Sequence, residues 1–168
     1  RRISSAASDV YKRQTHYIYA PKEDSYIRQK WRLKDKSLEA RSIPKNIAQV
    51  YTLSPGADIN RKSKKDFNFL LSKFNFAIDK GFSEVGLLFD DIDINNIGIE
   101  SDDKDLGKFH GELISEVTTK LSLSNGWFCP SIYCQSFSKK GIQNDKYLEG
   151  VSETCLLYTS DAADDIRR

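Results

Sequence analysis

The chain lacks long apolar runs, a regular set of cysteines and a leader-like start. It has 168 residues, of which 39% are hydrophobic and 30% are charged, as is ordinary for one globular domain. No apolar run approaches the ~20 residues of a membrane helix, so we expect no membrane partner. Cys129, Cys134 and Cys155 form neither an even disulfide framework nor a metal site, and we predict no metal and no cofactor. The compartment, cytoplasmic or secreted, stays unassigned, as do the organism and the oligomeric state.

The two ends of the chain are related to each other in an unusual way. Residues 4–14 and 155–165 can be encoded by nearly the same DNA read on opposite strands. Such an inverted pair resembles translated sequencing-library adapter, so we expect 1–14 and 155–168 to be artefactual tails around an interior of 15–154. The tails hold six basic and four acidic residues, which leaves 20 of each sign inside. A net charge of zero there gives no support to binding of nucleic acid.

The interior alternates between strand-like and helix-like segments. Apolar residues recur at helical spacing over 64–80, with Gly81 as a C-cap, and over 106–121. A short or broken helix, interrupted by Pro44, is expected within 36–48. Four β-type runs are predicted to be strands, and the third is continuously apolar, as in a buried parallel strand: 17–20, 49–53, 84–89 and 127–129.

Polar residues follow each predicted strand. Alternation of strands with long crossovers predicts an α/β fold with a parallel sheet covered by helices. The residues at the strand ends are Lys22, Ser54, Asp90 with Asp91, and Tyr133. Both (β/α) barrels and doubly wound sheets build their sites at the carboxyl ends of strands, and four strands do not decide between these folds.

Asp90 and Asp91 are adjacent carboxylates directly after an apolar strand. Their protonations are coupled, which raises one pKa and suits glycoside chemistry, where one group donates a proton while the other stays charged. Neighbours on a regular strand point to opposite faces, so both reach one substrate only where the strand has ended. Taken alone, the pair is also typical of a helix cap, a metal ligand or a solvated loop.

Read together, the strand ends resemble glycoside hydrolase family 84, which contains the protein O-GlcNAcases and bacterial β-N-acetylglucosaminidases. The resemblance implies that 15–154 is part of a (β/α)8 TIM-type barrel with about four parallel strands. The similar stretches are 19–24 (Tyr-Ala-Pro-Lys-Glu-Asp), 31–32 (Trp-Arg), 54–59 (Ser-Pro-Gly-Ala-Asp-Ile), 87–93 (Leu-Leu-Phe-Asp-Asp-Ile-Asp) and 128–134 (Phe-Cys-Pro-Ser-Ile-Tyr-Cys).

The resemblance also implies a reaction and a role for each site residue. The reaction removes terminal β-linked N-acetylglucosamine from a glycoside or glycoprotein, with retention, through an oxazoline formed by the substrate's own acetamido group. Asp90 would accept a hydrogen bond from the acetamido N–H, and Asp91 would be the general acid and then the base. Lys22 and Tyr133 would bind the sugar, and Cys129 would line the pocket. Without the resemblance, Lys22 is typical of a solvated loop and Tyr133 of an aromatic residue at the rim.

The chain departs from the family pattern in three places. Ile132 stands where the family has a glutamate, and the link between Pro21 and Val50 is shorter than the family's. The family's first strand and last three strands are absent. We therefore expect the activity to belong to a longer parent and the present chain to be inactive alone.

Two other functions remain open at this level. Asp91-Ile92-Asp93 spells Asp-x-Asp, which can bind Mg²⁺ in metal-dependent phosphotransfer or sugar transfer. A catalytically inactive sugar-binding domain is the other alternative. The natural substrate, whether a glycoprotein, a glycan or a small glycoside, is not indicated.

Overall fold

A four-stranded parallel sheet forms the centre of the molecule. The structure, a computed structural model, describes residues 15–60, 62–90, 104–138 and 140–154. The strands lie side by side in chain order: β1 (His16–Tyr19), β2 (Ala48–Leu53), β3 (Glu84–Leu88) and β4 (Gly126–Cys129). This confirms the predicted α/β class and all four strands.

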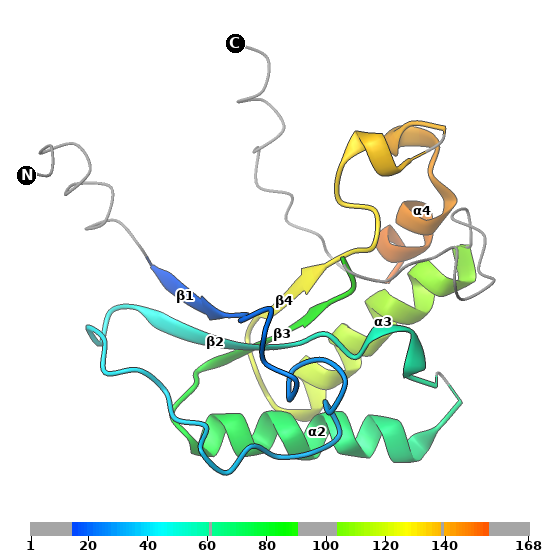
Figure 1. The fold of residues 1–168 in the computed structure, drawn as a ribbon. Coiled ribbons are helices and arrows are strands. Elements are labelled where there is room, and N and C mark those ends of the chain that lie inside the picture. Colours follow the sequence, from blue (N-terminus) through cyan, green and yellow to red (C-terminus); the bar gives the residue numbers. More distant parts are fainter. Residues whose placement is uncertain (1–14, 61, 91–103, 139, 155–168) are drawn as a thin grey trace, which may run out of the picture.

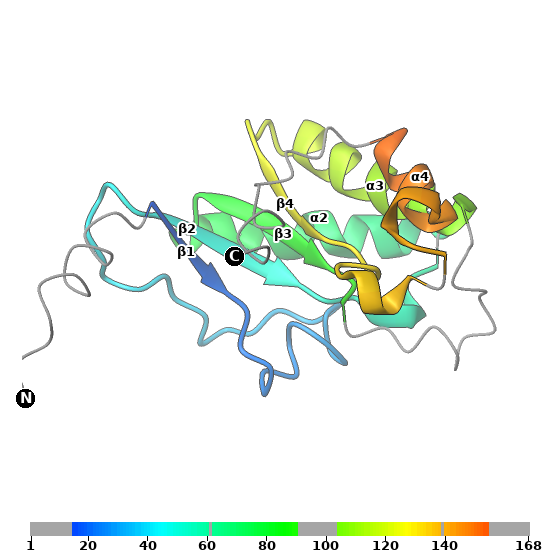
Figure 2. The same cartoon turned by 90° about the horizontal axis from the view of Figure 1, so that it is seen from above.

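Two long helices cover one face of the sheet. They are α2 (Lys64–Asp79) and α3 (Lys104–Lys120), and both lie on the same side in two views at right angles (Figure 1, Figure 2). A doubly wound sheet has helices on both faces and a reversal of strand order. Sequential parallel strands with helices on one side are instead the arrangement of a barrel segment. Among the described residues, no helix is long and apolar enough to cross a membrane.

Local sequence sets the ends of α2. The Ser63 hydroxyl accepts the backbone N–H of Asp66 at 3.2 Å, which caps the first turn. At the other end, Gly81 has a φ of +99° and the N–H of Phe82 reaches the carbonyl of Ala77 at 3.2 Å. This is a Schellman ending, in which glycine takes the left-handed position as predicted.

The helix predicted within 36–48 is wrong. Residues 20–47 form turns and extended chain that run along the helical side of the sheet (Figure 1). The Arg41 N–H donates to the Gln49 side-chain oxygen at 2.9 Å, and the N–H of Ala40 donates to the carbonyl of Lys80 at 3.1 Å. These external partners, together with Pro44, replace the i to i−4 bonds that a helix would need.

The core lies between the sheet and this helical layer. Alternate residues of the strands point into it, and the 20–47 segment contributes as much as a crossover helix would. Trp31, Ile27 and Leu38 from that segment are buried, and they belong to one cluster with residues of β2, α2, β3 and α3. Its other buried members are Tyr51, Leu53, Leu70, Phe74, Ala77, Phe82, Val85, Leu87, Phe89, Leu113, Ile114 and Val117.

The remaining side chains of each strand point to the opposite face of the sheet. No helix among the described residues covers it, and Ile18 is 43% exposed. A Cβ atom at Gly86 would lie 2.9 Å from Cβ of Trp127, so the missing side chain makes room for the indole. At the end of β1, the buried Thr52 hydroxyl donates to the carbonyl of Tyr19 at 2.6 Å.

A short helix packs closely on α3. This helix, α4 (Lys146–Ser152), follows two 3-10 turns, η2 (Gln135–Phe137) and η3 (Ile142–Asn144), just as η1 (Gly56–Asp58) follows β2. A Cβ at Gly107 would lie 1.9 Å from the carbonyl oxygen of Tyr147, and one at Gly150 would lie 2.0 Å from that of Lys104. The two backbones therefore touch at positions that only glycine allows.

Candidate functional site at the carboxyl ends of the strands

The strand register places the ends of the four strands, which the predicted site residues follow, at the same edge of the sheet. Tyr19, Tyr51, Val85 and Gly126 are aligned across the four strands. Three residues further along the chain come Leu88 and Cys129, which are a registered pair, and Lys22 and Ser54, which follow the ends of β1 and β2. Parallel strands end at the same edge, so the residues proposed to bind the sugar gather there.

Asp90 lies where β3 has just ended. The N–H of Phe89 still donates to the carbonyl of Cys129 at 2.8 Å, and the turn begins at Asp90, which is half-buried. The strand has therefore ended before Asp90. Asp91 and Asp93 lie outside the described residues.

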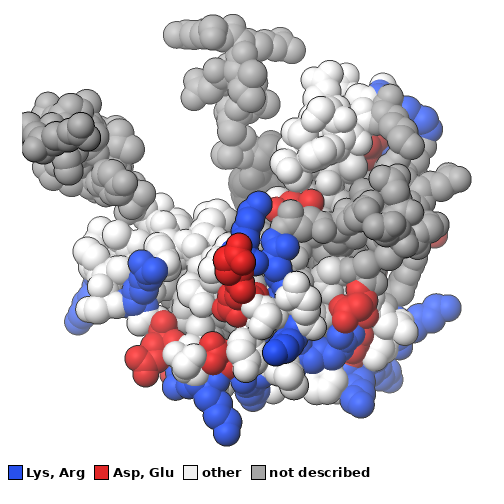
Figure 3. Space-filling view, in the orientation of Figure 1, with Lys and Arg blue, Asp and Glu red and all other residues white. Residues whose placement is uncertain are grey.

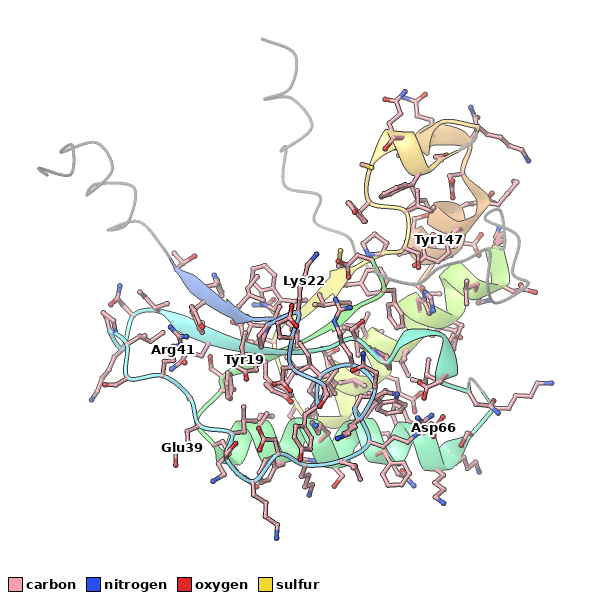
Figure 4. All side chains as sticks on the ribbon, viewed as in Figure 1. Tyr19, Lys22, Glu39, Arg41, Asp66 and Tyr147 are labelled. Atoms are coloured by element: carbon pink, nitrogen blue, oxygen red, sulfur yellow. The ribbon has the colours of Figure 1, made fainter. Side chains whose placement is uncertain are left out.

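Lys22 begins the segment after β1 and is exposed. Its side chain points to the face of the sheet opposite α2 (Figure 4). The turn behind it is held by Asp24, which accepts the Tyr19 hydroxyl at 3.0 Å and the backbone N–H of Tyr26 at 2.8 Å. Burial, followed by the hydrogen bond to Asp24, raises the pKa of Tyr19 to about 12, so this hydroxyl stays protonated at neutral pH.

A buried lysine supports the same segment from below. Lys73 on α2 is 1% exposed, and its ammonium donates to the carbonyls of Tyr26 and Leu33. Burial lowers the pKa of Lys73 to about 8, although Asp24 and Asp35 oppose the shift. Lys73 thus supplies donors that the irregular segment, having no helix, cannot supply to itself.

Two of the family-like stretches meet in one polar cluster. The Trp31 indole N–H donates to Asp58 at 2.7 Å, and the Arg32 guanidinium donates to Asp58 at 2.6 Å and to Asp66 at 2.8 and 2.9 Å. Arg32 holds the pKa of Asp66 below its ordinary value. Asp58 thus ties the segment after β1 to the turn after β2 (Figure 4 labels Asp66).

The end of β4 carries Cys129 and Tyr133. Cys129 is half-buried beside the end of β3. Tyr133 is 53% exposed and packs edge-on against Phe137, with ring centroids 5.0 Å apart. Ile132, which replaces the family's glutamate, is 3% exposed in a small core with Leu106, Tyr147 and Val151, so its apolar side chain is used in packing.

Sequence analysis missed several residues that hold this edge. Lys73 and His110 lie on the otherwise apolar faces of α2 and α3, and that placement was the available signal. A further polar contact, between Trp127 Nε1 and Glu84 at 2.5 Å with His16 3.5 Å from Glu84, lies at the opposite, amino end of the strands.

The surface around the site shows no segregation of charge. Basic and acidic side chains are interspersed over the face in Figure 3. The described residues contain no group of three His, Cys, Asp or Glu side chains able to hold a metal ion.

Comparisons with known proteins identify relatives of this chain. A family model described as beta-N-acetylglucosaminidase matches residues 2–155 and so runs across the expected boundary at Thr15. The rat and mouse proteins named protein O-GlcNAcase are each 29% identical to the chain over 153 residues. That alignment covers 83% of this chain and 16% of each relative, so the chain spans about a sixth of their length.

Solved structures agree on the fold. An O-GlcNAc hydrolase of Thermobaculum terrenum, solved as a point mutant, superposes with a TM-score of 0.62 at 21% identity over 84% of this chain and 32% of its own. The protein CpGH84B superposes with a TM-score of 0.65 at 23% identity over 84% of this chain and 26% of its own. The family model covers most of the residues, and the motifs lie at one edge of a barrel-type sheet. The chain therefore belongs to the β-N-acetylglucosaminidase family, glycoside hydrolase family 84.

Proposed function

We propose that this chain is the part of a retaining β-N-acetylglucosaminidase that carries its catalytic carboxylates, Asp90 and Asp91. The observation that supports this most is the gathering of Lys22, Asp90 and Cys129 at one edge of the parallel sheet, within a family of this activity. The proposed substrate is a terminal β-linked N-acetylglucosamine on a glycoside or glycoprotein.

The proposed mechanism divides the work between two acids. Asp90 accepts a hydrogen bond from the acetamido N–H, which turns the acetamido oxygen toward the anomeric carbon. That oxygen forms the new bond as the glycosidic bond breaks, and Asp91 donates its proton to the leaving oxygen. Water, deprotonated by Asp91, then opens the oxazoline with net retention. Lys22 and Tyr133 bind the sugar, and Cys129 lines its pocket.

We propose further that residues 15–154 act within a longer polypeptide, which we call the full-length protein. The relatives and solved structures are three to six times longer than the part that this chain matches. The exposed β1 and β4 edges and the open sheet face need the remaining strands of a barrel. Residues 15–154 expressed alone are expected to be poorly soluble and to show no turnover of aryl N-acetylglucosaminides.

Leaving-group dependence in the full-length protein tests the two roles. Asp91→Asn should lower kcat/KM by about 10²–10⁴-fold for a poor leaving group and much less for an acidic phenol, which departs without a proton. Asp90→Asn should lower kcat/KM for both. Asp105→Asn, an exposed carboxylate on α3, is the matched control and should change little. Equal losses for both leaving groups in Asp91→Asn would contradict the general-acid assignment.

A further inference from the structure

The ends of β3 and β4 are joined behind the proposed site by a chain of three side-chain contacts. The Phe89 ring stacks on the His110 ring with centroids 3.7 Å apart and planes 9° apart. His110 Nδ1 lies 2.9 Å from the Tyr147 hydroxyl, and that hydroxyl accepts the backbone N–H of Ser131 at 3.1 Å. All three rings are buried, with exposures of 0%, 2% and 2%.

This chain of contacts reaches both halves of the site. Phe89 directly precedes Asp90, and Ser131 lies between Cys129 and Tyr133. The pairing of β3 with β4 stops at the bond from Phe89 to Cys129. Beyond that point, the His110–Tyr147 pair links the two strand ends through residues of α3 and α4 (Figure 4 labels Tyr147).

Tyr147 is held in a fixed position. The helix α4 that carries it touches α3 through Gly107 and Gly150, at distances to backbone atoms that exclude any side chain. Lys104 of α3 adds ion pairs at 2.6 Å to both Glu149 and Glu153 of α4. Because α4 is fixed against α3, the Tyr147 hydroxyl can hold the Ser131 backbone in place.

We propose that His110 and Tyr147 are positioning residues that fix Asp90 and Tyr133 relative to each other. We assign the direction of the second contact as follows: the Tyr147 oxygen accepts the Ser131 N–H with one lone pair and donates its own proton to Nδ1 of a neutral His110. In this assignment His110 carries its proton on Nε2, and its neutral ring stacks on Phe89. The link to catalysis rests on the proposed glycosidase function.

Substitutions in the full-length protein separate this role from simple packing. Tyr147→Phe removes only the hydroxyl, and His110→Leu removes the acceptor. Each should lower kcat about tenfold or more while KM stays within about threefold, because small misplacements of catalytic groups act on the transition state. His110→Asn keeps an acceptor near the Nδ1 position and should recover most of kcat. Tyr51→Phe, at an equally buried tyrosine on β2, is the matched control.

Two further measurements, both by NMR, do not depend on activity. In histidine-labelled protein, the ring signal lost in His110→Asn should have the nitrogen shifts of the Nε2–H tautomer. The amide signal of Ser131 should move in Tyr147→Phe and stay in place in Tyr51→Phe. The Nδ1–H tautomer, or an unmoved Ser131 amide, would overturn the hydrogen-bond assignment.

The outcomes also separate this proposal from the proposed function. Tyr147→Phe with a kcat equal to that of Tyr51→Phe in an active enzyme overturns the positioning role alone. A full-length protein that hydrolyses no β-N-acetylglucosaminide overturns the proposed function and with it the catalytic role, while the tautomer and the amide shift still decide the contact itself.

Discussion

The connection from β1 to β2 is held by buried charge, whereas the connection from β3 to β4 is held by close backbone packing. In the first, residues 20–47 have no helix, and Lys73 and Arg32 donate to carbonyl and carboxylate oxygens. In the second, α3 satisfies its own backbone, and glycines let α4 approach it. Both connections bring a family-like motif to the same edge of the sheet.

The comparison shows what an irregular crossover requires. A helix pairs its own N–H and C=O groups, but an extended segment leaves them for other residues to satisfy. The first connection should therefore be sensitive to charge and pH, and the second to side-chain volume. The predictions below test that difference in the full-length protein, from the largest expected effect to the smallest.

Gly107→Ala should break the second connection. Its Cβ would lie 1.9 Å from the carbonyl oxygen of Tyr147, so α4 must move away from α3. We expect a loss of about 3 kcal/mol in the free energy of unfolding. Urea unfolding followed by tryptophan fluorescence measures it. Ser115→Ala, on the exposed face of the same helix, is the control, and equal midpoints for the two variants would show that the contact is not tight.

Asp66→Asn should break the first connection through charge. It removes the carboxylate that accepts two Arg32 bonds and the Asn60 N–H at 3.0 Å. The expected loss is about 2 kcal/mol at pH 7, with Asp79→Asn as the exposed control. Because the folded pKa of Asp66 is lowered, its stabilisation is present above about pH 4 and is lost as the pH falls further. A difference between wild type and variant that persists at pH 2 would contradict the ion-pair explanation.

Lys73 should make the stability of the first connection depend on pH between pH 8 and 10. Its folded pKa of about 8 lies below the unfolded value, so the unfolded chain binds the extra proton between the two. The free energy of unfolding should therefore rise by on the order of 1 kcal/mol per pH unit from pH 8 to 10. Above pH 10, Tyr19 and Tyr51 act in the opposite sense, because burial raises their folded pKa.

Lys73→Met is the variant that tests this origin. It should flatten the rise between pH 8 and 10, whereas Lys64→Met, at an exposed position of the same helix, should keep it. Urea midpoints measured at half-unit intervals resolve the two slopes. An undiminished rise in Lys73→Met would assign the effect to another group.

Tyr19→Phe should produce the smallest effect. It removes the hydroxyl that donates to Asp24 at 3.0 Å in the turn behind Lys22. We expect about 1 kcal/mol of destabilisation, together with a KM that rises more than kcat falls, since Lys22 is proposed to bind the sugar. Tyr17→Phe on the same strand is the control. A change in kcat alone would place Tyr19 nearer to the chemistry than proposed.

Periodicity predicted most of the fold, because α2, α3 and the four strands each contain a full apolar repeat. It failed within 36–48, where the apolar residues pack as parts of an extended chain held by the Gln49 side chain. The helix α4 was also missed, because its stability comes from glycines of α3 about 40 residues earlier in the chain. No local pattern reports such a contact.

The strand pattern predicted where the site lies, because parallel strands end at one edge and Lys22 and Asp90 follow two of them. The roles of Lys22, Asp90, Asp91, Cys129 and Tyr133 came from family resemblance and stay predictions. Lys73 and His110 could have been noticed as polar residues on buried helix faces, but their partners are set only by the tertiary structure.

The Thr52 hydroxyl donates to the carbonyl of Tyr19, the last residue of β1. Pro21, two residues later, has no N–H and cannot extend the ladder with β2. Valine at position 52 has the same shape as threonine but would remove this side-chain bond from a buried position. One buried hydroxyl thus ties the end of β1 to β2 just before the chain turns away from the sheet.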